Sequence, residues 1–445
     1  MTTIAQLHER VQYLFGERAD QLAKETGFVK RKRQLGGADF VQGLVFGLLA
    51  NPDHSTEELA SIVGRRDVQI SASGLSQRFT QEAAQLLQRL REEAVALGIE
   101  AEQAVPSELL SRFEAVILED STSIRLPGIL ADLWPSCGGG GKQSKAGIKW
   151  HVRWDLKQGG VQGVLTPSRV ADPSSPLRKQ GIAEGTLNIA DEAYCSLEWL
   201  GEQPGMFLCR PRSRVQFLDP ESKAVLDLSE IGPLVVGQAL DRDVLVGKEA
   251  KLPARLILVR VPEEVVEQRQ ARIRAEAKRR GHAQPNAQSL LRARWTLLIT
   301  NVARSTLQVR EVLVLQRARW QIERLFRLWK EDGKIDEWRG RTRWRILCEL
   351  VAKLLAMLLQ HWLLVMGTWD DPFRSLVKAA KQVRVHALEL LSALAGEGNW
   401  ERVVQRLMQA MHGCRVHRRT KHPCHAQLLL EGLDWQIFEE ELPLT

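Results

Sequence analysis

Two aspartates in this sequence each follow a short apolar run that predicts a buried strand. Residues 113–118 (Phe-Glu-Ala-Val-Ile-Leu) lead to Asp120, and residues 187–190 (Leu-Asn-Ile-Ala) lead to Asp191. Apolar runs of this length that contain β-branched residues favour strands. In open α/β sheets, ligand-binding groups gather at the carboxyl ends of the strands. We therefore expect each of these strands to end at its aspartate and both aspartates to serve a binding or catalytic site.

A glutamate lies between two cations on one face of a predicted long helix. Arg319, Glu323, Phe326 and Lys330 are spaced by four, three and four residues, so their side chains share a helical face. A ladder of surface ion pairs has the same spacing and is the simpler interpretation of this helix alone. The upstream aspartates and the basic balance of the chain favour a functional site instead.

The elements that must position these residues are predicted to include both strands and helices. Further strands are predicted at 149–156, 161–165 (as its hairpin partner), 206–210, 234–236, 254–261 and 295–301. Residues 263–280 are charged and predict a solvated helix or a mobile arm, and residues 344–366 predict an apolar helix. Lys353, Gln360 and His361 interrupt that apolar stretch, so we expect a buried helix and no membrane span, which needs about 20 largely apolar residues.

The first hundred residues predict short helices. A basic run covers residues 30–33, and Ser55 with Glu58 has the spacing of a capping box, so a helix should begin at Ser55 and end at Gly64. A further helical stretch covers about 75–90. Short helices that are separated by a glycine-containing turn, with arginines just before the last helix, favour a helix-turn-helix. A plain helical bundle fits the pattern as well. The candidate DNA contacts in this part of the chain are Arg65, Arg66 and Arg78.

Composition narrows the class of protein. The chain has 445 residues, which predicts two to four structural units, and 44% of them are hydrophobic. A formal charge of +8 favours a polyanionic partner such as nucleic acid, or reflects no more than a basic surface. Six widely spaced cysteines and charged residues within the first 19 positions predict a reduced, cytoplasmic protein without a secretory signal.

The segment around Glu323 resembles the bacterial insertion-sequence transposases that use an Asp-Asp-Glu triad. Specifically, it is similar to the group with a Tyr-x2-Arg-x3-Glu-x6-Lys signature. The sequence reads Gln-Arg-Ala-Arg-Trp-Gln-Ile-Glu-Arg-Leu-Phe-Arg-Leu-Trp-Lys over residues 316–330. Glu-Asp120-Ser-Thr and Asp191-Glu-Ala-Tyr resemble the two aspartate motifs of the family. The resemblance runs with gaps from about residue 40 to 385.

Two positions depart from the family pattern. Gln316 stands where the signature has tyrosine, and Ala193 stands where a glycine usually follows the second aspartate. Glutamine keeps hydrogen-bonding ability but lacks the ring. Alanine is a mild change if the backbone there does not need a positive φ.

The resemblance implies an α/β fold with an RNase H-like catalytic core that is interrupted by a β-rich insertion. An N-terminal helical DNA-binding domain and a helical C-terminal region would flank the core. The implied boundaries are 1–105 for the N-terminal domain, 106–205 and 300–385 for the two parts of the core, 206–299 for the insertion, and 386–445 for the basic C-terminal region.

The resemblance also implies the chemistry. Asp120, Asp191 and Glu323 would hold two Mg²⁺ ions, with Mn²⁺ able to substitute, because hard cations prefer carboxylate oxygens. The residues implied to contact DNA near this triad are Arg319, Lys330, Trp320 and Gln316. The implied activity is cut-and-paste transposition by a homodimer on paired transposon ends, followed by joining to target double-stranded DNA in the nucleoid.

Two alternatives to this function stay open. A retired transposase would bind its ends in a sequence-specific way without cutting them, and a metal nuclease on the same core would cut without strand transfer. Two local motifs also have competing interpretations. Histidines and cysteines at 412–425 offer zinc-type ligands at an irregular spacing, and interleaved cations favour a DNA-facing tail instead. The glycines at 138–141 precede Lys142 but lack phosphate-loop spacing, which predicts a flexible loop.

Overall fold

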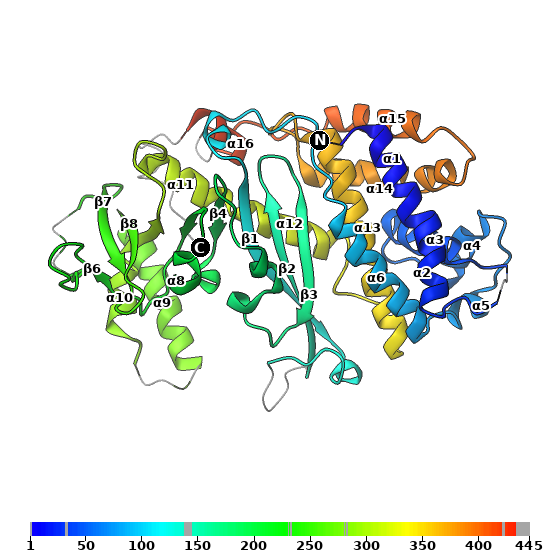
Figure 1. Cartoon of the computed structure of the whole chain (residues 1–445), viewed down its shortest axis with the longest axis horizontal. Coiled ribbons are helices and arrows are strands. Elements are labelled where there is room, and N and C mark those ends of the chain that lie inside the picture. The colour runs from blue at the N-terminus through cyan, green and yellow to red at the C-terminus, as the bar shows by residue number, and fades with distance from the viewer. Residues whose placement is uncertain are drawn as a thin grey trace. The chain divides into compact units, whose positions relative to one another are not determined.

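The computed structural model describes residues 2–31, 34–137, 145–229, 231, 234–279, 281, 284–420 and 423–432. These residues form a mixed α/β chain with a nine-stranded sheet and with helices toward both ends of the sequence (Figure 1). They divide into two compact units. The first unit comprises residues up to 106, 121–171 and 322–416, and the second comprises 107–120, 172–321 and the residues from 417 on.

Helices dominate the first unit. Its N-terminal helices are α1 (Ile4–Gln12), a π-helical turn at Tyr13–Arg18, α2 (Ala19–Glu25), α3 (Gly37–Ala50), α4 (Thr56–Gly64), α5 (Ala72–Ser76) and α6 (Gln81–Ala96). The predicted capping box is confirmed, because the Ser55 hydroxyl accepts from the Glu58 backbone and the Glu58 carboxylate accepts from the Ser55 backbone. The helical stretch predicted over about 75–90 is divided between the end of α5 and the start of α6. Thr80 caps a new helix, and its hydroxyl accepts from the Ala83 backbone.

The core of the first unit is built on α13 (Arg343–Thr368), which packs against α3, α6, α14 (Leu376–Leu394) and α15 (Trp400–His412) (Figure 1). Among the described helices, α13 alone is long and apolar enough to cross a membrane, yet 94% of its most apolar window is buried inside the protein. The buried helix predicted from the sequence is therefore confirmed.

A hairpin of β2 (Ala146–Asp155) and β3 (Val161–Pro167) also belongs to the first unit, and its antiparallel register pairs Trp150 with Leu165. This confirms the predicted hairpin. Trp150 is fully buried and stacks on Trp329 with ring centroids 4.4 Å apart. Trp329 lies in a π-helical turn (Leu328–Asp332), so the stacking fixes that turn against the hairpin.

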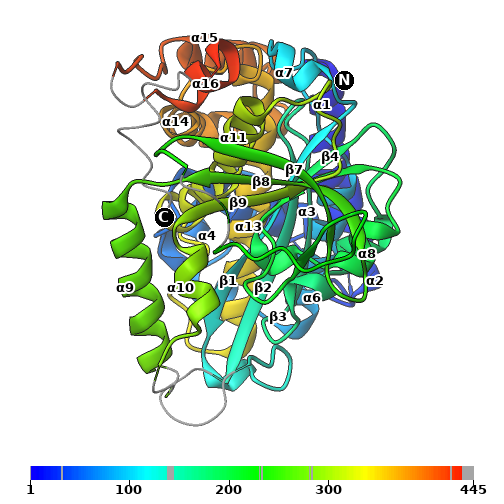
Figure 2. The ribbon, with the colours of Figure 1, turned by 90° about the vertical axis from the view of Figure 1, so that its left-hand side faces the viewer.

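The strand order of the whole sheet is β3-β2-β1-β4-β5-β9-β8-β7-β6. In the second unit, the first half of β1 (Val116–Leu126) is parallel to β4 (Leu187–Ala190), and β4 is parallel to β5 (Met206–Cys209). The remaining strands run antiparallel and are β9 (Trp295–Thr300), β8 (Leu252–Arg260), β7 (Ala239–Val246) and β6 (Phe217–Leu218). Helices α9 (Glu263–Arg279) and α10 (Ala287–Arg292) lie beside these antiparallel strands (Figure 2). Short helices α7 (Glu108–Ser111), α8 (Leu197–Gly201) and α16 (His425–Glu431) complete this unit, together with α11 (Val309–Ala318).

One strand prediction is wrong in its limit, and another is wrong altogether. The first strand does not end at Asp120 but continues to Leu126, because residues 121–126 alternate between buried and more exposed positions as a strand does. Residues 234–236 form no strand. Gly237 has a φ of 83°, and the Gln238 backbone N–H donates to Val235 O, so the chain turns before β7 begins.

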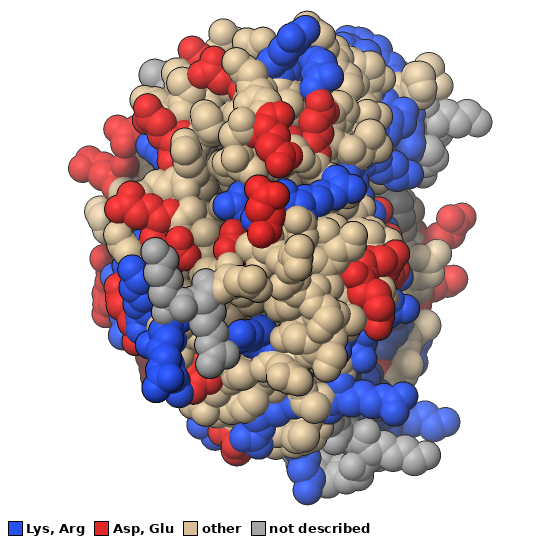
Figure 3. All heavy atoms as spheres, turned by 90° about the vertical axis from the view of Figure 1, so that its right-hand side faces the viewer, with Lys and Arg blue, Asp and Glu red and all other residues tan. Residues whose placement is uncertain are grey.

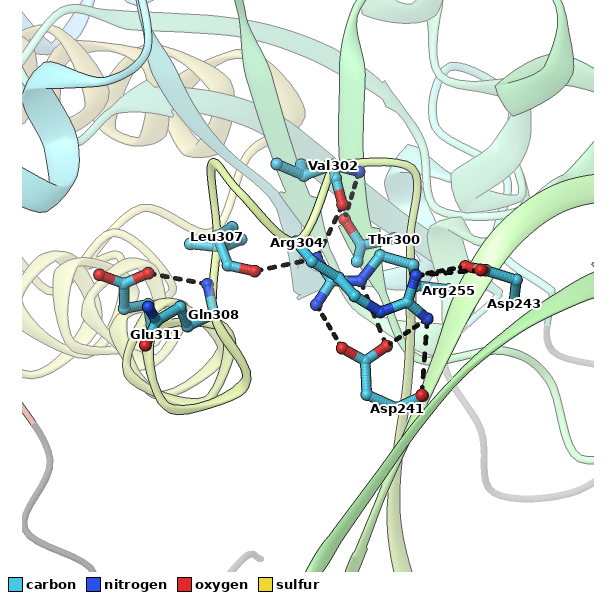
Figure 4. Close-up of polar contacts among 9 residues, drawn as sticks. All are labelled: Asp241, Asp243, Arg255, Thr300, Val302, Arg304, Leu307, Gln308 and Glu311. Carbon is cyan, nitrogen blue, oxygen red and sulfur yellow. Dashed lines mark hydrogen bonds and ion pairs between the residues drawn. The ribbon is translucent and has the colours of Figure 1, made fainter.

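A polar network fastens the connection between β9 and α11 (Figure 4). The buried Arg255 of β8 pairs with Asp241 of β7 at 2.7 Å and donates to the backbone oxygens of Val302 and Leu307. Arg304 from the connection itself pairs with Asp241 at 3.1 Å. Arg255 thus holds the connection through the connection's own backbone carbonyls, while the Asp241 carboxylate fixes the guanidinium of Arg255. Carboxylates and carbonyl oxygens are typical partners of a buried guanidinium.

Candidate active site

Asp120 and Asp191 occupy equivalent positions on neighbouring parallel strands. The register pairs Glu119 with Ala190, and Asp191 keeps an extended backbone (φ −81°, ψ 171°). The next positions along both strands are therefore Asp120 and Asp191, on one face of the sheet, and neighbouring strands lie about 4.8 Å apart. Both aspartates are half-buried. The sequence thus correctly predicted that a strand leads to each aspartate.

The turn after Asp191 tolerates the departure at residue 193. Glu192–Tyr194 form a 3-10 helical turn that Asp191 precedes as N-cap. Ala193 is not among the described residues with positive φ. A glycine is therefore not required at this position by the backbone.

A buried ion pair that no sequence motif predicted lies behind the aspartates. Glu119 is 1% exposed and points to the sheet face opposite to that of Asp120, because side chains alternate along a strand. Its carboxylate accepts from Arg178 Nη2 at 3.1 Å and from Asn188 Nδ2 at 3.3 Å. Arg178 lies in a 3-10 turn (Pro176–Gln180) where no motif or spacing marks it as special.

Two buried cysteines lie beside the second aspartate. Cys195 follows the turn after Asp191, and Cys209 ends β5 opposite Ala190. The Cys209 thiol donates to the Cys195 sulfur over 3.5 Å. The contact with Cys195 and complete burial raise the pKa of the Cys209 thiol, while the same hydrogen bond lowers the pKa of Cys195. Both remain free cysteines in this structure.

Arg319 contacts the first aspartate directly. Its Nη1 lies 3.5 Å from Asp120 Oδ2, and the Arg319 side chain is only 4% exposed. The guanidinium also lies over the ring of Trp320, 5.7 Å from its centroid. The sequence predicted a role for Arg319 at the site, and the structure places it against one of the predicted carboxylates.

The predicted long helix around Glu323 is interrupted. It consists of α11, a turn at Arg319, α12 (Trp320–Arg327) and the π-helical turn Leu328–Asp332. Glu323 is half-buried in the first turn of α12. Because a π turn holds more residues than an α turn, Lys330 departs from the predicted common face. Its Nζ donates to Ser123 O of β1 at 3.0 Å.

Gln316 lies on α11 and is 3% exposed. In the described part of the chain, neither atom of its amide has a hydrogen-bond partner. A buried amide without partners is costly, so this position suits a group that binds something when the site is filled.

The three N-terminal arginines differ in their surroundings. Arg65 is exposed at the end of α4, whereas Arg66 pairs with Asp39 at 3.0 Å. Arg78 lines a hollow of about 400 Å³ together with Lys30 and Arg31. On the face drawn in Figure 3, Lys and Arg side chains occur at several separate places with Asp and Glu between them. The net positive charge of the chain is therefore not gathered into one patch on this face.

The aspartates fit part of a divalent-metal site. They supply carboxylate oxygens from one sheet face, which are the donors that Mg²⁺ and Mn²⁺ prefer. Within the described ranges, no three His, Cys, Asp or Glu side chains form a group that could hold a metal ion. A complete site therefore needs a ligand beyond the Asp120–Asp191 pair.

Among the described residues, the His and Cys cluster at 412–425 forms no group that could hold a metal ion. Cys414 is buried and its thiol donates to Ala410 O at 3.6 Å. His422 of the same cluster lies outside the described residues, as do Lys32 and Arg33 of the basic run and the glycines at 138–141.

Comparisons with known proteins place this chain among transposases. The profile of a family described as "Transposase DDE domain" matches residues 111–359, more than half of the chain. The transposase for insertion sequence element IS231F of Bacillus thuringiensis subsp. israelensis is 26% identical over 379 residues, which cover 79% of this chain and 78% of that protein. The transposase for IS1151 of Clostridium perfringens is 24% identical over 366 residues, 76% of each chain. Because the matched region contains both strand-borne aspartates and the glutamate helix, the chain belongs to the family of insertion-sequence transposases with a DDE domain.

Proposed function

We propose that this protein is a cut-and-paste DNA transposase of the group with the Tyr-Arg-Glu-Lys signature. The observation that carries the proposal is the register of β1 and β4, which puts Asp120 and Asp191 side by side on one sheet face. Such a pair of carboxylates suits a metal-dependent reaction at a phosphodiester. The mixed sheet around the pair supports an RNase H-like core interrupted by the strands of residues 206–299.

Glu323 is the third carboxylate of the proposed site. Bound Mg²⁺ or Mn²⁺ ions would activate a water or 3′-hydroxyl and stabilise charge on the leaving oxygen. Asp120, Asp191 and Glu323 would hold the ions; Asp120 lies within β1, Asp191 directly after β4 and Glu323 on α12. Carboxylates that share a site repel one another, and a bound cation would relieve that repulsion.

The cations beside the triad bind the DNA backbone. Arg319 and Lys330 contact phosphates at the transposon end, and Trp320 and Gln316 line the same place. Gln316 supports this assignment because its buried amide has hydrogen-bonding groups to offer. Arg65, Arg66 and Arg78 bind DNA from the N-terminal helical domain. The protein acts as a homodimer on paired ends and then joins them to target DNA.

The decisive experiment measures cleavage of DNA that carries the element's own ends, with Mg²⁺, Mn²⁺ or EDTA. Asp191→Asn and Glu323→Gln should each lower cleavage at least about 100-fold, because even residues that only support metal ligands contribute 10–100-fold. End binding should stay within a few-fold, since it rests on phosphate contacts.

The matched control is Glu331→Gln. This glutamate follows Glu323 by eight residues, and its side chain is 71% exposed beside Arg327. Its variant should cleave normally. Specific end binding without breaks in the wild type would instead favour a retired transposase that only holds DNA. Breaks without joined products would favour a plain nuclease.

A further inference from the structure

We propose that Arg178 is a positioning residue that fixes the spacing of Asp120 and Asp191. This inference rests on the proposed function of the two aspartates as metal ligands. The hydrogen bonds of Arg178 go to Glu119 and Tyr194 and not to either aspartate. It acts on the backbone that carries each of them, from the opposite face of the sheet.

The contacts of Arg178 join the chain segments on both sides of the pair. Its Nη2 donates to the carboxylate of Glu119, the residue directly before Asp120. The same nitrogen donates to the backbone oxygen of Tyr194, three residues after Asp191. One guanidinium therefore ties the end of the β1–β4 pairing to the turn that follows β4.

The surroundings hold this guanidinium in one orientation. It lies over the Trp199 ring of α8, 4.1 Å from the centroid, and over the Tyr194 ring at 5.2 Å. Arg178 is 5% exposed. A planar guanidinium can stack on rings and donate to two acceptors together, whereas a lysine ammonium cannot reproduce that geometry. Arg178→Lys thus keeps the charge and removes the fixed orientation.

Spacing matters because two ligands of one small cation must present their oxygens at defined positions. Mg²⁺ and Mn²⁺ sites demand nearly fixed geometry, and the groups that orient metal ligands commonly contribute 10–100-fold to metal affinity. Glu119 itself cannot serve as a ligand on the Asp120 face, because its carboxylate is engaged behind the sheet. Its role in this arrangement is to hold Arg178.

The test is a Mn²⁺ titration of the full chain followed by electron paramagnetic resonance, without DNA. Arg178→Lys should weaken Mn²⁺ binding about tenfold. Glu119→Gln should shift it in the same direction and provides a second variant if the lysine variant folds poorly. DNA cleavage by Arg178→Lys should fall at low Mn²⁺ and recover partly at high Mn²⁺.

Arg91→Lys is the control for disturbing a buried arginine. Arg91 is 1% exposed on α6 in the other unit, so its variant should lose thermal stability and keep its Mn²⁺ affinity. If Arg178→Lys and Glu119→Gln lose stability but bind Mn²⁺ within twofold of wild type, the positioning role is refuted. Asp191→Asn separates the two proposals. If it binds and cleaves normally, the proposed function fails, and if it loses both while the Arg178 variant does not, only the positioning role fails.

Discussion

Replacing Arg319 by glutamine should tighten cation binding at the aspartates and still reduce DNA cleavage. Arg319 Nη1 lies 3.5 Å from Asp120 Oδ2, so a metal ion that binds Asp120 has to share or displace this positive charge. Removing the guanidinium removes a competitor of the cation. It also removes the group that we assign to a DNA phosphate. The two consequences have opposite signs, which makes the substitution informative.

The size of the effect follows from the distance. Two unit charges 3.5 Å apart interact by about 1 kcal/mol in bulk water and by about 5 kcal/mol at an effective dielectric constant of 20. Arg319 is 4% exposed and Asp120 is 19% exposed, so the bulk-water value is the lower limit of the interaction. About 1 kcal/mol corresponds to a factor of about five. Arg319→Gln should therefore bind Mn²⁺ at least about fivefold more tightly than wild type.

A Mn²⁺ titration monitored by electron paramagnetic resonance measures the affinity, and cleavage of end DNA at saturating Mn²⁺ measures the second effect. Arg327→Gln is the matched control, because it removes the same charge from α12 at a side chain that is 71% exposed. Its Mn²⁺ affinity should be unchanged. An Arg319→Gln affinity that is unchanged or weaker would show that the ion pair with Asp120 does not oppose metal binding.

Two further predictions concern the first unit. Lys330→Ala should make the slope of log K against log salt shallower by about 0.9, since one phosphate contact is lost. Fluorescence anisotropy of end binding at several salt concentrations measures this slope. An unchanged slope would show that Lys330 does not contact DNA. Burial lowers the pKa of His361 to about 4, so the unfolded chain binds more protons between pH 4 and about 6.5 and stability falls as the pH drops through that range. His361→Gln should keep the hydrogen bond to Gly159 O and should lose up to about 3 kcal/mol less unfolding free energy than wild type between pH 7 and 4.5. Denaturant titrations at the two pH values measure this difference. Equal losses of unfolding free energy in both proteins would contradict the prediction.

Local patterns predicted much of the fold because they report local physics. The capping box at Ser55 marks the start of α4 through its hydrogen bonds. The partial alternation of apolar residues from Ile148 to Trp154 predicts strand β2, although the structure buries both of its faces. The interruptions were harder. The turn at Gly237 depends on one positive φ, and the new helix after Thr80 depends on one N-cap residue. The apolar pattern of the neighbouring residues does not reveal either feature.

The candidate site was predictable to a smaller extent. Acidic residues after apolar runs predicted where Asp120 and Asp191 lie along the chain. The pairing of their strands could not be read from spacing, because parallel strands are joined by long connections. Arg178 was missed for the same reason. Its partner Glu119 is 59 residues away in the sequence, and both residues are ordinary charged residues until the fold buries them.

The error about β1 is the most instructive of these differences. The sequence predicted a strand that stops at Asp120, whereas the structure has a strand that stops pairing with β4 at Glu119 and continues to Leu126. The two arrangements agree in one respect, because in each of them Asp120 is the first residue beyond the pairing with β4. The longer strand adds rigidity, since residues on both sides of Asp120 are held in extended conformation. A carboxylate in the middle of a strand is thereby oriented by the sheet, and a loop residue at a true strand end would not be. We therefore expect Asp120, more than Asp191, to keep its position when the turn after β4 is loosened.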